Sequence, residues 1–164
     1  MRLWHGPYGK KLMLFAVKNS QVMERHGYQC EQILAGYPVF EEKGIVPHFE
    51  DPGCPVMVYA DPGMLNRVIQ NLISNGVKYT AGDIFFRICR ETDRVFITVS
   101  NPVSTYVDVS HIFDRFYTQD KSRSRGSGIG LYLCKQFTEA MGGGICAELE
   151  ENILIVKVTL PMVK

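Results

Sequence analysis

NLISNGVKYT, residues 71–80, ends a segment in which apolar side chains recur at the spacing of an amphipathic helix. Upstream, Asp61 offers a side-chain oxygen that can cap a helix. Pro62 suits the first helical position, because its missing N–H would have no intrahelical partner there. The sequence therefore predicts a helix from Pro62 to about Tyr79. Its apolar stripe consists of Leu65, Val68, Ile69, Leu72 and Gly76.

Another side of this predicted helix carries two amides and two cations. Arg67, Asn71, Asn75 and Lys78 follow one another at i, i+4, i+8 and i+11. Neutral carboxamides bind a hard divalent ion without adding negative charge that would repel a triphosphate, and a lysine ammonium binds phosphate as a point charge. The alternative is a solvated face, since polar side chains opposite a core are common on surface helices.

Further along, GSGIGL, residues 126–131, places a glycine-rich turn directly before a predicted helix. Such a turn lets backbone N–H groups approach phosphate, and the helix N-terminus adds partial positive charge. The segment is no dinucleotide fingerprint, because a basic loop rather than a strand precedes it, and it lacks the Lys-Ser/Thr ending of a P-loop. The alternative is a flexible loop with a helix cap.

In this order, the segments resemble the sequence boxes of bacterial sensor histidine kinases. Residues 71–80 resemble the N box and residues 126–131 the later glycine box. Between them, IFDRFY, residues 112–117, is similar to the F box, and residues 120–123 are similar to the ATP lid. The resemblance covers about Ile45 to Pro161 and implies ATP and Mg²⁺ as ligands.

The resemblance also implies a fold shared with gyrase-type and heat-shock chaperone ATPases. Runs of strand-forming residues grouped in hairpins, with helices between them, agree with that fold. We expect an α+β protein, a two-layer α/β sandwich of the Bergerat type. Its mixed, mostly antiparallel sheet would carry the helices on one face.

Site residues follow from the matching positions. Asn75 matches the Mg²⁺ ligand of the family, Asn71 the second N-box amide, and Lys78 and Tyr79 positions beside the phosphates and the base. Hydrolysing relatives have a water-activating glutamate where this chain has Asn71, and an amide cannot act as that base. The resemblance therefore favours phosphoryl transfer over hydrolysis. The other residues expected to contact the nucleotide are Asn101, Phe116, Tyr117, Arg123, Gly126, Leu131 and the lid-hinge glycines Gly128 and Gly130.

Three departures from the family pattern stand out. The first glycine box, normally Asp-x-Gly-x-Gly, is replaced by NPVST, residues 101–105. Asn101 can still accept a hydrogen bond from the adenine amino group but lacks the charge of a carboxylate, a loss of about 1 kcal/mol, so we expect weaker ATP affinity. Alternatively, Asn101 is only a turn residue at a strand end. Thr118 stands where many relatives have arginine, and no last glycine box is evident between Glu148 and Ile153.

The phosphate acceptor is not apparent in this sequence. His5, His26, His48 and His111 all lie outside the sequence setting of a phosphoacceptor histidine. The resemblance then implies transfer to a histidine-bearing dimerisation domain of the parent kinase, with a response regulator as the indirect partner. It also implies a cytoplasmic domain of a membrane-anchored parent. Two alternatives stay open: a degenerate module that docks without transferring phosphate, and a serine kinase, which the missing glutamate at Asn71 disfavours.

Length and composition limit the number of domains and the classes of ligand that this chain can have. The 164 residues suffice for one compact domain, which we expect over 29–164, after a tail or remnant of a preceding region over 1–28. The net charge of +1 gives no electrostatic footprint for nucleic acid or a membrane surface. Five widely spaced cysteines without a C-x-x-C pair favour neither disulfides nor zinc, and fit a reducing cytoplasm.

The remaining elements are predicted from local periodicity and turn signals. We expect a kinked helix over 29–43, a hairpin of strands 45–49 and 56–59, and an antiparallel pair of strands 84–90 and 95–101. A short helix over 109–116, a mobile basic loop over 118–125 and a helix from near Gly128 to Met141 follow. Two final strands cover 145–148 and 153–160.

Overall fold

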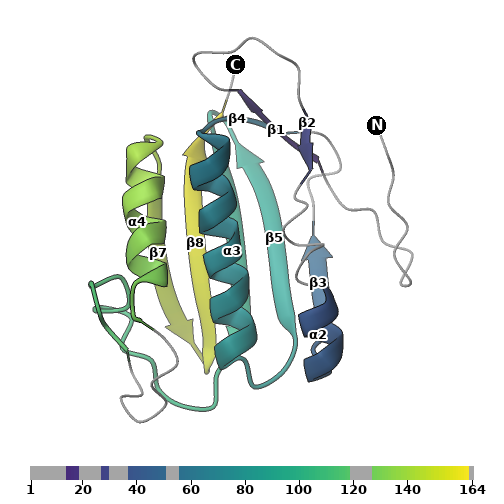
Figure 1. Ribbon diagram of the computed structural model, residues 1–164, viewed down its shortest axis with the longest axis vertical. Coiled ribbons are helices and arrows are strands. Elements are labelled where there is room, and N and C mark those ends of the chain that lie inside the picture. Colours follow the sequence, from purple (N-terminus) through teal and green to yellow (C-terminus); the bar gives the residue numbers. More distant parts are fainter. Residues whose placement is uncertain (1–13, 19–26, 30–36, 51–55, 119–126, 163–164) are drawn as a thin grey trace.

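The computed structural model describes residues 14–18, 27–29, 37–50, 56–118 and 127–162 (Figure 1). A five-stranded sheet is its centre, with the strand order β3-β5-β6-β8-β7. Only the β3–β5 pair is parallel, so the sheet is mixed and mostly antiparallel, as predicted. Its strands are β3 (Pro47–Glu50), β5 (Ile84–Glu91), β6 (Arg94–Pro102), β7 (Gly144–Glu150) and β8 (Ile153–Pro161).

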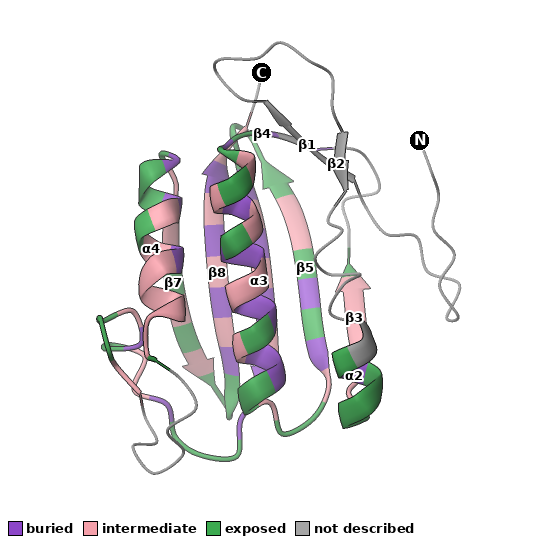
Figure 2. Cartoon of the chain, in the orientation of Figure 1, coloured by how far each residue is buried: buried purple, intermediate pink, exposed green. Residues whose placement is uncertain are grey.

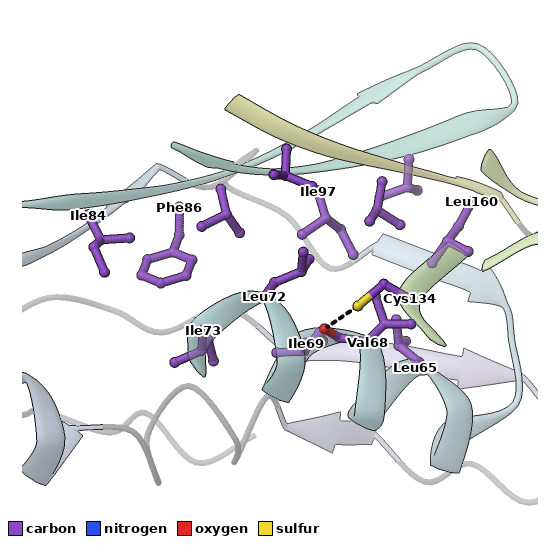
Figure 3. Close-up of a cluster of buried hydrophobic side chains, with 14 of the residues drawn as sticks. Leu65, Val68, Ile69, Leu72, Ile73, Ile84, Phe86, Ile97, Cys134 and Leu160 are labelled. Carbon is purple, nitrogen blue, oxygen red and sulfur yellow. Dashed lines mark hydrogen bonds between the residues drawn. The ribbon is translucent and has the colours of Figure 1, made fainter. Parts of the chain in front are cut away.

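Two helices, α3 (Pro62–Tyr79) and α4 (Gly130–Ala140), cover one face of this sheet (Figure 1). Between the two layers lies the core, to which α3 contributes residues including Leu65, Val68 and Leu72 (Figure 3). In β6 and β8, buried residues alternate with more exposed ones, so each strand turns every second side chain toward the helices (Figure 2). The predicted two-layer α+β sandwich is confirmed.

The start of α3 also follows its sequence signals. Asp61 adopts an extended conformation, and its side chain accepts a hydrogen bond from the Met64 N–H at 2.8 Å. Pro62 is the first helical residue, where its ring fits the helical φ and no hydrogen bond is lost. The helix that presents Asn71 and Asn75 is therefore fixed at its N-terminus by local chemistry.

Tight turns join the predicted pair β5–β6 and also β7–β8, whose strands form a second hairpin. Thr92 in the first turn and Glu151 and Asn152 in the second have positive φ, which two-residue hairpin turns require. The carbonyl oxygen of Asn152 accepts a hydrogen bond from the Val103 N–H at 2.8 Å. This bond ties the β7–β8 turn to the chain directly after β6.

The predicted hairpin of residues 45–49 and 56–59 is wrong. β3 pairs in parallel with β5, whereas β4 (Val56–Tyr59) pairs in parallel with β1 (Leu14–Lys18). β1 also pairs antiparallel with β2 (Gly27–Gln29), which gives a separate sheet of order β2-β1-β4. Turn signals between two strand-like runs cannot reveal such partners, because both belong to segments distant in sequence. The predicted turn at 51–53 lies outside the described residues.

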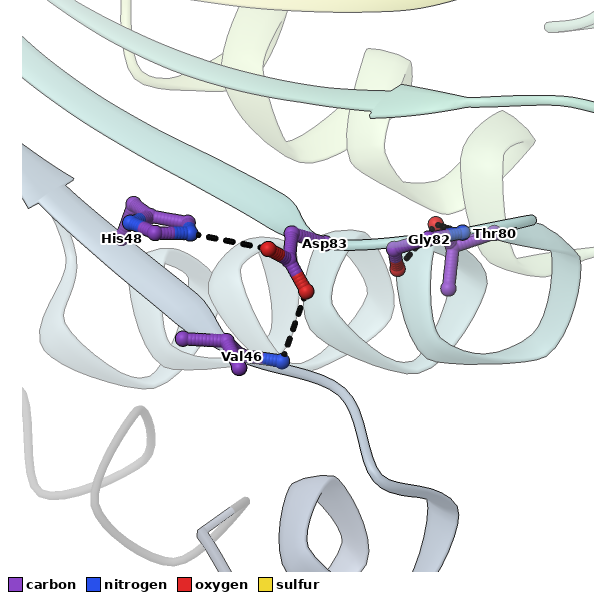
Figure 4. Close-up of polar contacts among 5 residues, drawn as sticks. All are labelled: Val46, His48, Thr80, Gly82 and Asp83. Carbon is purple, nitrogen blue, oxygen red and sulfur yellow. Dashed lines mark hydrogen bonds and ion pairs between the residues drawn. The ribbon is translucent and has the colours of Figure 1, made fainter.

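One carboxylate holds β3 at the edge of the five-stranded sheet (Figure 4). Asp83, just before β5, accepts the Val46 N–H at 3.1 Å through Oδ1, and its Oδ2 lies 3.1 Å from His48 Nε2. The His48 ring stacks on Phe85, with ring centroids 4.6 Å apart. Hydrogen bonding from His48 and then from the Val46 N–H lowers the pKa of Asp83, so this carboxylate stays ionised.

Two predicted helices differ from the structure. The helix expected over 29–43 is α2 (Tyr37–Lys43); Gln29 ends β2, and 30–36 lie outside the described residues. Pro38 thus stands in the first turn, where proline is tolerated, rather than kinking a longer helix. Residues 109–116 form successive turns instead of a helix, with Asp114 N–H donating to the His111 carbonyl oxygen at 2.9 Å.

Other boundaries shift less. α4 begins two residues after Gly128, because the φ of +64° at Gly128 is incompatible with a right-handed helix. Most of the predicted loop over 118–125 lies outside the described residues, which end at Thr118 on this side. The segment 1–28 includes β1 and part of β2, and its separation from the domain stays a prediction.

Candidate functional site

The amide-bearing face of α3 lies directly against the start of α4. A Cβ atom built on Gly130, the first residue of α4, would lie 3.6 Å from Asn71 Oδ1 and 3.8 Å from its Cγ. The Asn71 carboxamide therefore lies at an ordinary van der Waals distance from Gly130, the first residue of α4. Two motifs far apart in the sequence meet here, as a shared ligand site requires.

Asn75 and Lys78 extend this face by one and two turns of α3. Four residues of helix separate Asn75 from Asn71, a rise of about 6 Å. Asn75 is half-buried, and within the described ranges its side chain makes no hydrogen bond. Lys78 is exposed in the last turn, with its Nζ 4.7 Å from the centre of the Tyr79 ring. An amide oxygen and an ammonium are thus available to an anionic ligand with its metal.

Asn101 borders α3 at Gly76, next to Asn75. It lies near the end of β6, only 3% exposed, on the side of the sheet that faces the helices. Its Nδ2 donates to the Pro102 carbonyl oxygen at 3.3 Å, and its Oδ1 lies 3.9 Å from where a Cβ on Gly76 would stand. The alternative interpretation of Asn101 as only a turn residue at a strand end is wrong, because Asn101 is a buried residue within β6, beside α3.

The N-terminus of α4 lacks a side-chain cap in the part of the chain that the structure describes. Ile129 occupies the cap position, and no side chain caps the first turn. The first N–H groups of a helix have no intrahelical partners and carry partial positive charge. Because Asn71 borders this end, an anion bound there would also contact the amides of α3.

Phe116 and Tyr117 border the same region from the F-box turns. Gly128 packs on their backbone, and the Phe116 N–H donates to the Gly128 carbonyl oxygen at 3.0 Å. Phe116 is 61% exposed, and the Arg115 guanidinium lies 4.7 Å from the centre of its ring. Burial, followed by charge interactions with Asp108, raises the pKa of Tyr117, which is therefore neutral at physiological pH.

Three further predicted residues have simpler outcomes. Leu131 is partly buried and packs against the hydrophobic core, directly after Gly130. Arg123 and Gly126 lie outside the described residues. The structure thus brings together Asn71, Asn75, Asn101 and Gly130 along α3, with Lys78 and Tyr79 at the end of that helix.

The sequence analysis missed the role of one residue at this site. Cys134 lies one turn after Gly130 in α4, is fully buried, and donates its thiol proton to the Val68 carbonyl oxygen at 3.6 Å (Figure 3). Burial raises the pKa of Cys134 to about 12. Cys134 was not among the predicted site residues; its position i+4 from Gly130 on the same helix was the available signal.

Comparison with known proteins agrees with this geometry. Residues 60–164 match the model of the histidine kinase-, DNA gyrase B-, and HSP90-like ATPase family. The chain belongs to this family. The match includes the whole of α3, β6 and α4, and therefore every described residue of the candidate site.

Relatives within this ATPase family are sensor histidine kinases. The chain is 33% identical over 123 residues to the sensor histidine kinase YcbM of Bacillus subtilis, covering 71% of this chain and 40% of YcbM. It is 40% identical over 154 residues to the probable sensor kinase SilS of Salmonella typhimurium, covering 84% of this chain and 31% of SilS. The chain therefore spans less than half the length of these two relatives.

Solved structures show the same fold. The nucleotide-free catalytic domain of histidine kinase ThkA superposes with a TM-score of 0.72 at 25% identity, over 80% of this chain and 88% of that domain. Full-length ShkA in complex with AMPPNP superposes with a TM-score of 0.71 at 24% identity, over 82% of this chain and 29% of ShkA. Among the described residues of this chain, no helix is both long and apolar enough to span a membrane.

Proposed function

We propose that this chain is the ATP-binding catalytic domain of a two-component sensor histidine kinase and transfers the γ-phosphoryl group of ATP to a histidine on a separate dimerisation domain. The contact between Asn71 of α3 and Gly130 of α4 carries the proposal. It places an amide stripe beside an uncapped helix N-terminus, and the two together suit a triphosphate.

The residues present fit a magnesium ion. Asn75 offers a half-buried carboxamide oxygen, and no described residue is hydrogen-bonded to it. Mg²⁺ binds oxygen and usually takes only one or two protein ligands, with waters and substrate phosphates completing its shell. When bound, the ion neutralises charge on the β- and γ-phosphate oxygens. Asn75 would hold it, with Asn71 one turn away as the second amide.

The other site residues divide between the phosphates and the base. Lys78 places an ammonium near the phosphates, and the N–H groups in the first turn of α4 add partial positive charge. Asn101, buried beside Gly76, accepts the adenine amino group through Oδ1, since its Nδ2 already donates to Pro102. The remaining predicted nucleotide contacts are Tyr79, Phe116, Tyr117, Arg123, Gly126, Gly128 and Leu131.

The proposed reaction needs little covalent chemistry from this chain. A neutral imidazole presents a lone pair to phosphorus, so a histidine acceptor needs no general base before attack, whereas water or a serine hydroxyl does. Asn71 cannot serve as such a base. The chain would therefore position the nucleotide and stabilise its charge, while the acceptor supplies the nucleophile.

The partners follow from the same proposal. The acceptor is the histidine-bearing dimerisation domain of the parent kinase, which then passes phosphate to a response regulator. We place this domain on the cytoplasmic side of a membrane-anchored parent, where ATP is available. The similarity to YcbM and SilS, of which this chain matches only part, supports a longer parent.

A binding experiment tests the nucleotide site. A fluorescent ATP analogue titrated with Mg²⁺ should bind saturably, and Asn75→Ala should weaken binding about tenfold or more, as expected for a lost contact to a charged ligand. The matched control is Asn66→Ala on α3, because nine residues of helix place Asn66 on the side opposite Asn75. Equal affinity of Asn75→Ala and the unmodified chain would overturn the assignment of this face.

A transfer experiment separates kinase activity from docking alone. The chain is mixed with Mg²⁺, radiolabelled ATP and a separately produced histidine-bearing helical hairpin from a parent-type kinase. Acid-labile phosphate on the hairpin supports histidine phosphorylation. Saturable ATP binding without any transfer favours a docking module, and acid-stable phosphoserine favours a serine kinase; either result contradicts the proposal.

A further inference from the structure

The connection from α3 to β5 closes into a small turn through one hydroxyl group. The Thr80 hydroxyl donates to the Gly82 carbonyl oxygen at 2.8 Å and accepts the Gly82 N–H at 3.1 Å (Figure 4). A hydroxyl can do both, because it has one proton and two lone pairs. A single side chain therefore sets the shape of this Thr80–Gly82 turn.

The Thr80–Gly82 turn lies directly on Pro102, at the end of β6. Within the turn, the Ala81 N–H donates to the Pro102 carbonyl oxygen at 2.8 Å, and the Thr80 hydroxyl oxygen lies 3.5 Å from the same atom. A Cβ atom built on Gly82 would lie 3.1 Å from Pro102 Cγ. The turn is thus in close contact with both the ring and the carbonyl group of this proline.

The Pro102 carbonyl oxygen also binds the side chain of Asn101. Asn101 Nδ2 donates to it at 3.3 Å, so the oxygen uses its two lone pairs for Asn101 and Ala81. A flipped carboxamide would instead hold its oxygen against a second acceptor, with no proton between them. Asn101 is only 3% exposed, so bulk water would not replace the lost bond. The Asn101 amide therefore has one favoured orientation.

The oxygen of the Asn101 carboxamide lies on the side of α3. Oδ1 is 3.9 Å from the Cβ position of Gly76, and among the described residues it accepts no hydrogen bond. Gly76 directly follows Asn75, so this acceptor borders the amide-bearing face of α3. A ligand bound there meets a hydrogen-bond acceptor and not a donor.

We propose that Thr80 is a positioning residue, whose turn holds the Pro102 carbonyl oxygen where it orients the Asn101 amide, so that the site binds a 6-amino purine and rejects a 6-oxo purine. The choice of base rests on the proposed function, whereas the orientation of the amide does not. A 6-amino group donates to Oδ1, but a 6-oxo group would face that oxygen as a second acceptor. The rejection follows because a buried polar group would be left without a partner.

Three variants separate the hydroxyl of Thr80 from the rest of its side chain. Thr80→Val and Thr80→Ala remove the hydroxyl, whereas Thr80→Ser retains it. Thr98→Val is the matched control, since Thr98 lies on β6 three residues before Asn101 and therefore on the opposite face of the sheet. If the valine variant of Thr80 does not fold, the alanine variant carries the same comparison.

The first readout is independent of any nucleotide. In a ¹⁵N-labelled chain, the Asn101 side-chain NH₂ signals are assigned by their loss in Asn101→Asp. Solvent exchange of these protons should rise about fivefold in Thr80→Val and Thr80→Ala, the effect of one net hydrogen bond, and change by less than about twofold in Thr80→Ser and Thr98→Val. Unchanged exchange in the valine and alanine variants of Thr80 would overturn its positioning role.

The second readout is the choice between two nucleotides. ATP and inosine triphosphate, which carries a 6-oxo group, each compete with a fluorescent ATP analogue in the presence of Mg²⁺. The unmodified chain should bind ATP at least about tenfold more tightly than inosine triphosphate. This ratio should fall about fivefold in Thr80→Val and Thr80→Ala, and by less than about twofold in Thr80→Ser and Thr98→Val.

The ratio of the two affinities distinguishes positioning from a general loss of structure. A purely structural role of Thr80 would weaken both nucleotides equally and leave the ratio unchanged, which would contradict the proposal. Equal binding of the two nucleotides by the unmodified chain would also contradict it. If the unmodified chain binds neither nucleotide, the proposed function fails, and the exchange of the Asn101 amide protons still decides the orientation.

Discussion

Gly128 packs directly on the backbone of Phe116. A Cβ on Gly128 would lie 2.6 Å from the Phe116 carbonyl carbon, and the Gly128 carbonyl oxygen accepts the Phe116 N–H at 3.0 Å. Distances this short leave no room for any side chain at Gly128. The end of the F-box turns is thereby held against the segment that leads into α4, and both segments border the proposed nucleotide site.

Gly128→Ala should therefore destabilise the protein and weaken nucleotide binding. Gly44→Ala is the matched control, because Gly44 has the same φ of +64° but nothing within 4 Å of its Cβ position. The left-handed conformation alone costs about 1–2 kcal/mol for an alanine, and Gly128→Ala should exceed this by the clash with Phe116. Urea unfolding and ATP-analogue titration measure both effects. Equal losses in the two variants would refute a special contact at Gly128.

Thr138→Val should stabilise the fold. The Thr138 hydroxyl is fully buried in α4, and among the described residues its oxygen has no hydrogen-bond partner. Valine has nearly the same shape and removes the buried polar atom, so we expect the free energy of unfolding to rise by about 1 kcal/mol. Chemical denaturation of the two chains provides the comparison, and a lower midpoint for the valine variant would show that the hydroxyl has a partner.

His111 should titrate above its ordinary value. Its Nδ1 lies 2.7 Å from Asp114 Oδ2, and this hydrogen bond, together with the charges of Asp108 and Asp114, raises the pKa of His111. Since the folded pKa is raised, the stabilisation is fully present below the unfolded value of about 6.5 and is lost as pH rises through the folded value. NMR titration of the imidazole should give a midpoint above 6.5. Asp114→Asn should move it down, and an unchanged midpoint would exclude Asp114 as the cause.

Asp83→Ala should loosen the edge of the sheet at β3. The variant removes the acceptor of the Val46 N–H and the partner of His48 at once. Hydrogen exchange at Val46 should accelerate, whereas Asp83→Asn, which keeps one acceptor oxygen, should have a smaller effect. Because the Asp83 pKa is lowered, the stabilisation is present above its ordinary value of about 3.8 and is lost as pH falls through the folded value. Equal exchange in all three chains would contradict this role.

Elements defined by local chemistry were predictable from the sequence. The cap at Asp61, the proline at position 62 and the apolar stripe specify α3, and turn residues specify the β5–β6 hairpin. The pairing partners of β3 and β4 were not predictable, because parallel pairing joins segments distant in sequence and leaves no turn signal between them. Residues 109–116 have helix-like apolar spacing but form turns.

The candidate site divides in a similar way. The amides of α3 and the glycines at the start of α4 could be found from spacing and from the resemblance, and the structure brings Asn71 and Gly130 into contact. The thiol of Cys134 could not be found in this way, because a cysteine at core spacing predicts apolar packing. Only the three-dimensional arrangement shows that its proton is directed to the Val68 carbonyl oxygen.

The hydrogen bond from Val103 to Asn152 has a consequence for how this sequence can change. The turn at 151–152 sets the register of β8, and β8 pairs with β6 from Arg94–Pro161 to Pro102–Ile153. An insertion of one residue in that turn would slip β8 against β6, and a one-residue slip exchanges the two faces of a strand. Residues that accept a positive φ can therefore replace Glu151 or Asn152. A change in the length of the turn, in contrast, would shift the strand residues that pair with Asn101.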